Sequence, residues 1–224
     1  MTRSIIILLV LAVLSGCAQT TTKRGAYPLM YGDQKPVSML VVPAINESTA
    51  ANAGDLLNAT ISQPLSNLGY YVMPMPIVAD IFQREGIIEG SQIKGLPTQM
   101  FKKNFGADSV LFMTITSWDK NYAVIAGNVT VGISYVLIGT ETNDILWSYD
   151  QTVVVDTGGG SGNILAGIIA TAIKTATTDY LPVAAQVHAQ AFLAMPFGGY
   201  HPRSGTDGEE KSVVVALKDK ALAE

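Results

Sequence analysis

The residue best placed to do chemistry in this chain is Cys17, the single cysteine among 224 residues. Its thiolate is a strong nucleophile, so the position could carry a covalent group. Cys17 follows an apolar run over residues 5–14, with Arg3 ahead of the run and the small residues Ser15 and Gly16 behind it. A basic start, a short apolar core and small residues before a cut site make up an export signal. The run is too short for a membrane span, which needs about 20 residues.

The four residues Leu14-Ser15-Gly16-Cys17 resemble the lipobox of bacterial lipoproteins. The resemblance implies cleavage between Gly16 and Cys17, a diacylglycerol on the thiol, and a further acyl chain such as palmitate on the new amino group. Two or more chains give a stable anchor, since each buried CH₂ contributes about 0.8 kcal/mol. In such lipoproteins an aspartate after the cysteine favours the inner membrane, so Ala18 favours the outer membrane. The alternatives are an ordinary signal peptide with an incidental cysteine, or an uncleaved apolar tail.

Other residues of catalytic or ligand-binding types form no recognisable site in the sequence. His188 and His201 lack a metal-binding spacing, so we expect each to be satisfied or exposed. The glycine-rich residues 158–162 lack the Lys-Ser/Thr pair of a phosphate loop and are predicted to be a flexible linker. Ser91 and Ser161 have no base nearby in the sequence, although a triad assembled from distant residues stays open. We therefore predict no metal, no cofactor and no enzymatic activity.

The composition indicates a compact, weakly charged body. Charged residues make up 14% of the chain and the formal net charge is −4, which argues against nucleic acid as a partner. With one cysteine the chain forms no internal disulfide, and a domain of this size needs none. The chain is predicted to comprise a signal peptide (1–16), a lipidated tether that lets the body stand off the membrane (17–36), a single α/β domain (37–195), and a mostly irregular tail (196–224).

The domain is predicted to start with a strand, a helix and a second strand. Residues 37–43 form a nearly unbroken apolar run, typical of a central strand covered on both faces. A helix is expected over about 50–68, kinked or split by Pro64 and closed by Gly69 in a left-handed cap. A short strand over 70–73 should follow it.

The remainder alternates short helices with a meander. Helices are predicted to begin at Pro76 and Pro97, and a late helix over 164–173 to continue at 184–194. Small residues in the late helix would allow another helix to pack closely.

Three antiparallel strands are expected over 108–118, 122–138 and 144–155. Alternation in the middle strand should place one apolar face toward the core. The predicted fold class is α/β (α+β): a mixed β-sheet with a strand-helix-strand start, an antiparallel three-stranded meander, and helices packed on it.

Several segments look like the bacterial lipoproteins catalogued as domain of unknown function 799: Pro64-Leu65, Gly69 to Pro74, Phe105 to Leu111, Leu146-Trp147 and Pro202-Arg203. Their layout is similar to the N-terminal domain of TolB and the periplasmic domain of the curli secretion lipoprotein CsgG. The resemblance implies a mixed α/β fold and a role in envelope assembly or secretion, and it brings no catalytic residues. The sequence departs from CsgG in one respect: it shows no pair of long amphipathic hairpins that could build a barrel. This absence argues against a pore formed by this chain.

We therefore expect a non-enzymatic outer-membrane lipoprotein on the periplasmic face, acting as an accessory subunit in envelope assembly or secretion. Its expected partner is another envelope lipoprotein, with a CsgG-like protein as the first candidate. One alternative is a periplasmic hydrolase of cell wall or lipid, which would need a Ser or Asp in a cleft beside His188. Another is a membrane-surface protein that self-associates as a homo-oligomer through the helix at 164–173.

Overall fold

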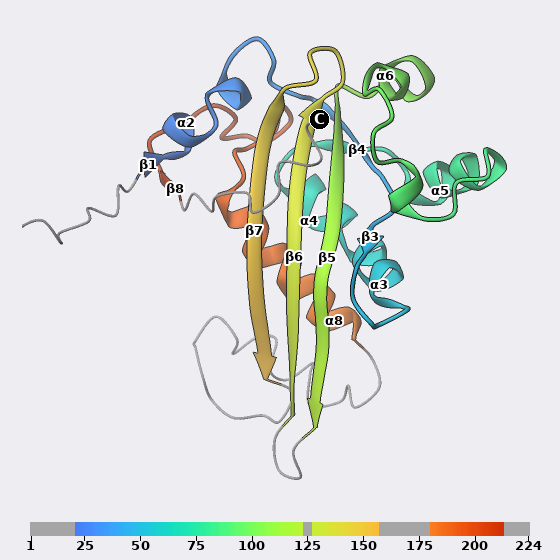
Figure 1. Ribbon diagram of the computed structural model, residues 1–224. Helices are drawn as coiled ribbons and strands as arrows, with labels where there is room; N and C mark the ends of the chain where they lie inside the picture. Colours follow the sequence, from blue (N-terminus) through green and yellow to red (C-terminus); the bar gives the residue numbers. More distant parts are fainter. Residues whose placement is uncertain (1–20, 123–126, 157–179, 213–224) are drawn as a thin grey trace, which may run out of the picture.

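The computed structural model describes residues 21–122, 127–156 and 180–212 (Figure 1). Gly16 and Cys17, the glycine-rich residues 158–162 and the predicted helix at 164–173 lie outside the described residues. Within the described ranges, no helix combines the length and the apolarity needed to span a bilayer.

A six-stranded mixed sheet forms the centre of the molecule, with β4-β2-β5-β6-β7 in order and β3 paired to β5 (Figure 1). The strands β2, β3 and β4 run parallel to their partners, whereas β5, β6 and β7 form the predicted antiparallel meander. The predicted fold class is confirmed. The strands are β2 (Ser38–Val41), β3 (Ile45–Asn46), β4 (Tyr71–Val72), β5 (Ser109–Tyr122), β6 (Gly127–Gly139) and β7 (Ile145–Asp156).

Helices cover both faces of this sheet. The helices α3, α4 and α8 pack on one face over the larger apolar core, and α5 and α6 pack on the other face over a smaller one. The central strand β2 supplies both cores, because Met39 and Val41 point to one face and Leu40 to the other. The helical segments are α2 (Lys23–Ala26), η1 (Pro28–Tyr31), α3 (Ala53–Thr60), α4 (Ser62–Asn67), α5 (Met75–Arg84), η2 (Gly90–Gln92), α6 (Gln99–Phe105), α8 (Leu181–Ala191) and η4 (Phe192–Ala194).

The helix predicted over 50–68 is split into α3 and α4, as the proline suggested. Pro64 lacks the N–H that would continue the α3 hydrogen-bond ladder. At the end of α4, Gly69 adopts φ +85°. The Tyr70 N–H donates to the Leu65 carbonyl and the Gly69 N–H to the Ser66 carbonyl, which is the Schellman arrangement. This turn sets the direction in which β4 enters the sheet.

The segment Gly106-Ala107-Asp108 joins α6 to β5, and each of its three residues makes a different contribution. Gly106 closes α6 in the left-handed region with φ +70°, and Ala107 is fully buried. The Asp108 carboxylate accepts from the backbone N–H and the hydroxyl of Ser38, at 3.0 and 2.9 Å, and from Lys102 at 2.8 Å. Burial would raise the pKa of Asp108, but these hydrogen bonds outweigh it and hold the pKa below its ordinary value.

Both ends of the described chain differ from the predicted tether and tail. Residues 21–36 are not a free tether: β1 (Thr21–Thr22) pairs with β8 (Lys211–Ser212), and Tyr27 and Met30 are buried in the larger core. Apolar periodicity missed this segment because its short turns bury side chains against distant strands rather than along one helix face. From residue 21 onward the tether prediction is corrected.

The described part of the tail, residues 196–212, consists mostly of turns, and it is packed against the body. The Gly198 N–H donates to the Leu68 carbonyl at 2.8 Å and the Tyr200 N–H to the Gly69 carbonyl at 3.0 Å. The buried Tyr70 hydroxyl donates to the Pro196 carbonyl at 2.6 Å. The folded body therefore extends over both predicted boundaries, from residue 21 to residue 212 of the described chain.

Candidate functional site

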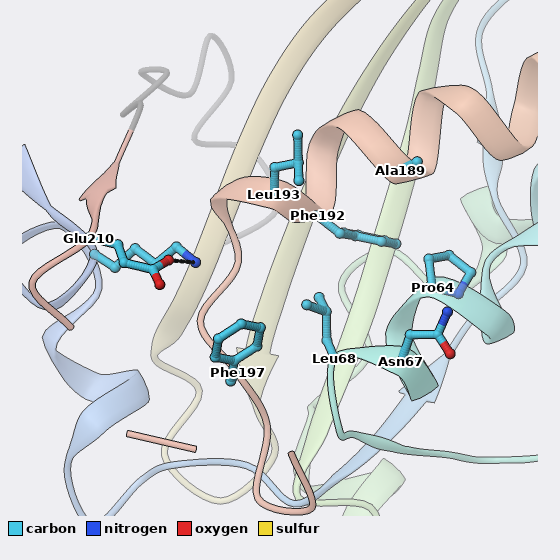
Figure 2. A pocket seen from close by; sticks show the side chains of 9 residues that line it. Pro64, Asn67, Leu68, Ala189, Phe192, Leu193, Phe197 and Glu210 are labelled. Carbon is cyan, nitrogen blue, oxygen red and sulfur yellow. Dashed lines mark ion pairs between the residues drawn. The ribbon is translucent and has the colours of Figure 1, made fainter. Parts of the chain in front are cut away.

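A pocket of about 260 Å³ lies where α4, the end of α8 and the tail meet the N-terminal segment (Figure 2). Its wall is largely apolar, its charged groups lie on the side of the N-terminal segment, and Asn67 lies on the opposite side (Figure 2). The lining residues are Pro64 and Asn67 from α4 and Leu68 just after it, Ala189, Phe192 and Leu193 from α8 and η4, Phe197 and Glu210 from the tail, and Lys23 from α2.

The polar side of the pocket is organised around Lys23, which is only 5% exposed. Its ammonium lies 3.3 Å from the Asp207 carboxylate, 3.2 Å from the Glu210 carboxylate and 3.4 Å from the Met195 carbonyl. Asp207 is fully buried, so each charge depends on the other. Removing one partner of such a buried pair costs about 3–5 kcal/mol, because the remaining charge is left uncompensated.

The Asp207 carboxylate accepts two further hydrogen bonds, one on each oxygen. The Tyr31 hydroxyl donates to Asp207 Oδ1 at 3.1 Å, and the Phe197 N–H donates to Oδ2 at 3.0 Å. Burial, and then the nearby carboxylate, raise the pKa of Tyr31, so this hydroxyl remains a donor. Burial would raise the pKa of Glu210, but hydrogen bonds from Lys23 and Arg203 outweigh it and lower the pKa, so the carboxylate stays ionised.

Phe197 forms one wall of the pocket, and charged and aromatic side chains surround its ring. The Lys23 ammonium and the Arg203 guanidinium each lie 5.1 Å from the centre of its ring. The His201 ring stacks on it with centroids 3.7 Å apart, and His201 Nδ1 accepts from the Arg203 N–H at 3.1 Å. His201 is thus satisfied, as predicted. The arrangement keeps Phe197 in place as one wall of the pocket.

His188 lies in the solid core rather than in a cleft. It is fully buried on α8, Nε2 lies 3.0 Å from the Leu57 carbonyl, and Nδ1 lies 2.9 Å from the Tyr135 hydroxyl. A carbonyl only accepts, so Nε2 carries the proton and Nδ1 accepts from Tyr135. Burial lowers the pKa of His188 to about 4. The predicted satisfied histidine is confirmed, and the cleft that a hydrolase would need beside His188 is occupied by core side chains.

The remaining predicted residues do not join the pocket. The Ser91 hydroxyl lies on the surface, 3.5 Å from a Glu89 carboxylate oxygen. Among the residues that the structure describes, no group of three or more His, Cys, Asp or Glu side chains could hold a metal ion. Cys17, Gly16 and Ser161 lie outside the described residues, so lipid attachment and cleavage at Gly16–Cys17 stay predictions.

Lys23, Asp207 and Phe197 were not among the predicted site residues. One signal pointed to the first two: Lys23-Arg24 near one end and Asp207-Gly208-Glu209-Glu210 near the other are short runs of opposite charge. Nothing local to either run shows that they meet, since about 180 residues separate them. The apolar wall has no signal of its own because each residue belongs to an ordinary helix or turn.

Comparisons with known proteins place the chain among lipoproteins. The family model described as "Putative lipoprotein GNA1162-like" matches residues 28–195. "Putative lipoprotein NMB1124/NMB1162" of Neisseria meningitidis serogroup B is 27% identical over 144 residues, which are 64% of this chain and 67% of that protein. The crystal structure of lipoprotein GNA1162 from Neisseria meningitidis is similar with a TM-score of 0.53 and 29% identity, covering 62% of this chain and 96% of that one. The predicted membership of a bacterial lipoprotein family is thereby confirmed under this description, while the label domain of unknown function 799 stays a prediction. The chain belongs to the GNA1162-like lipoprotein family.

Proposed function

We propose that this chain is a non-enzymatic lipoprotein of the outer membrane, anchored by lipid on Cys17 and facing the periplasm. In this proposal its α/β body serves as an accessory subunit in envelope assembly or secretion, next to another envelope lipoprotein. Membership of a lipoprotein family supports the anchor.

Family membership carries the proposal of an anchor. The position of Thr21, the first described residue, then decides how close to the membrane a lipid on Cys17 would hold the body. Thr21 is already paired with Ser212, and Lys23 is held by Asp207 and Glu210. Four residues span at most about 14 Å when fully extended. A lipid on Cys17 would therefore hold this corner of the body close to the bilayer surface instead of letting it stand off. The body would present its remaining surface to partners in the periplasm.

The anchor is tested by metabolic labelling with a fatty-acid probe, comparing the natural chain with Cys17→Ala. We expect the natural chain to be labelled and to fractionate with the outer membrane. The substituted chain should lose the label and no longer fractionate with the outer membrane, since the acyl chains would have no thiol to join. Labelling that survives Cys17→Ala would refute the assignment of the lipid to this residue.

The accessory role is tested by affinity purification from detergent-solubilised envelopes. We expect the full-length, lipidated chain to recover another envelope lipoprotein, with a CsgG-like protein as the first candidate. The same chain, denatured before it is used for capture, serves as the control for proteins that are recovered without recognising the folded body. Failure to recover any envelope lipoprotein in several detergents would count against this role while leaving the anchor intact.

The structure bears on the hydrolase alternative but not on the self-association alternative. The hydrolase depended on a cleft beside His188, and that residue is enclosed by core side chains with both ring nitrogens engaged. Self-association depended on the helix at 164–173, which lies outside the described residues. No observation on the described residues favours either one, so the accessory lipoprotein remains the function proposed.

A further inference from the structure

The pocket beside Lys23 offers a ligand apolar contact and little else. Leu68, Phe192, Leu193 and Phe197 form its wall, and Leu193 is 69% exposed at its edge. The charged groups on its polar side are already engaged. Lys23 pairs with Glu210 (Figure 2) and with Asp207, and Glu210 pairs with Arg203 as well. A ligand with its own charge would have to break one of these pairs. An uncharged hydrocarbon would not.

The pocket also lies next to the point where the chain leads back to Cys17. Lys23 lines it, and Thr21 is the first described residue, two positions before Lys23. The stretch from Cys17 to Thr21 reaches at most about 14 Å. Anything covalently attached to Cys17 is therefore confined to the neighbourhood of the pocket, at the high effective concentration that a short linker gives.

We propose that this pocket takes an acyl chain of the lipid carried by Cys17 of the same molecule. The inference rests on the proposed function, since it needs that lipid. One chain would lie against Leu68, Phe192 and Phe197 while the other chains stay in the membrane. The body would then be attached to its membrane-embedded lipid at two points, the peptide link at Cys17 and the acyl chain in the pocket. Two attachments would fix the orientation of the body on the bilayer as well as its distance from it.

Two other occupants are less well supported. A lipid headgroup would need a free cation, and the ammonium of Lys23 is 3.3 and 3.2 Å from its two carboxylate partners. An apolar side chain of a partner protein would fit the wall, but it lacks the short covalent link that concentrates the Cys17 lipid beside the pocket. Both occupants become outcomes of the experiment.

The test uses the full chain in cells fed a fatty acid that carries a photoreactive diazirine near its methyl end. After irradiation, the protein is purified, digested and analysed by mass spectrometry. We expect cross-links between the lipid on Cys17 and peptides of the same molecule that contain Leu68 or Leu193. Ala189→Trp should reduce these cross-links several-fold, because Ala189 lines the pocket and is exposed, so a ring fits there without entering the core. Gln190→Trp is the matched control, exposed on the same helix but not lining the pocket, and should leave them unchanged.

The outcomes separate this inference from the function on which it rests. If the same mass spectra show lipid on Cys17 but cross-links only to membrane lipids, to a second copy or to another protein, the pocket assignment is overturned and the anchor stands. Cross-links that persist equally in Ala189→Trp also overturn it. If no lipid is found on Cys17, the proposed function fails first. Thermal unfolding of both tryptophan variants checks that the body remains folded.

Discussion

His188 joins three elements of the larger core through one neutral imidazole ring. It receives a hydrogen bond from Tyr135 on β6 and donates one to Leu57 on α3, while its own backbone belongs to α8. Burial keeps the ring neutral by lowering its pKa to about 4, from an ordinary value of 6.5. In an unfolded chain the same ring would take up a proton at the higher value. The residue therefore couples the stability of the core to pH.

We predict that the protein loses stability as the pH falls from about 6.5 toward 4. In that window the unfolded chain binds a proton that the folded chain excludes, so acid favours unfolding, by on the order of 3 kcal/mol for a shift of this size. Above the ordinary pKa of histidine the contribution is fully present. Urea unfolding at several pH values measures it. His188→Gln should be less stable at pH 7 but show a shallower pH dependence. Equal slopes for the natural chain and His188→Gln would contradict the assignment.

The turn between α4 and β4 shows how far an element could be anticipated from the sequence. Pro64, Gly69 and the apolar run before β4 predicted the break, the left-handed cap and the strand, because each depends on residues close in sequence. The docking of the tail onto Gly69 was not predictable. It depends on the absence of a side chain at Gly69 and on backbone groups of residues 198–201, which leave no pattern in composition or periodicity.

Gly69→Ala is predicted to destabilise the protein by clearly more than Gly86→Ala. Both glycines have positive φ, +85° and +77°, so an alanine at either position costs about 1–2 kcal/mol in backbone strain. A Cβ on Gly69 would also overlap the backbone nitrogen of His201, whereas nothing lies within 4 Å of a Cβ on Gly86. Denaturant unfolding compares the two variants. Equal losses would show that the tail is not tightly packed against this turn.

Across the whole fold, features set by residues close in sequence were predictable, and contacts between distant parts of the chain were not. The meander, the strand-helix-strand start and the two-sided burial of β2 could be predicted, since regular periodicity reports burial. The pairing of β1 with β8 and the pocket could not, because both arise from contacts between opposite ends of the chain. Only the opposite charges around Lys23 and Asp207 hinted at this contact. The site that was predicted, Cys17, and the pocket that was not are joined by the short stretch before Thr21.

At the scale of the whole molecule, this short stretch predicts a defined orientation on the membrane. Lys211 lies on β8, paired with Thr22 of β1, and Gln83 lies on α5, on the opposite side of the sheet (Figure 1). Both side chains are exposed. Because Cys17 is the only cysteine and would carry lipid, Lys211→Cys and Gln83→Cys can each be labelled selectively with a fluorophore.

In vesicles carrying the anchored protein, a quencher attached to lipid headgroups should quench the label at position 211 more strongly than the label at position 83. The same labels on a soluble chain beginning after Cys17 serve as the control and should be quenched equally little. Equal quenching of the two labels in the anchored protein would show that the body tumbles freely on its link.

The central claim, that Cys17 is the lipidated first residue of the mature protein, is tested most directly by the mass of the protein purified from envelopes and of its N-terminal peptide. We predict a chain that begins at Cys17 and carries a diacylglycerol on sulfur with a further acyl chain on the amino group. A chain that retains residues 1–16, or one cut elsewhere with a free Cys17 thiol, would contradict it.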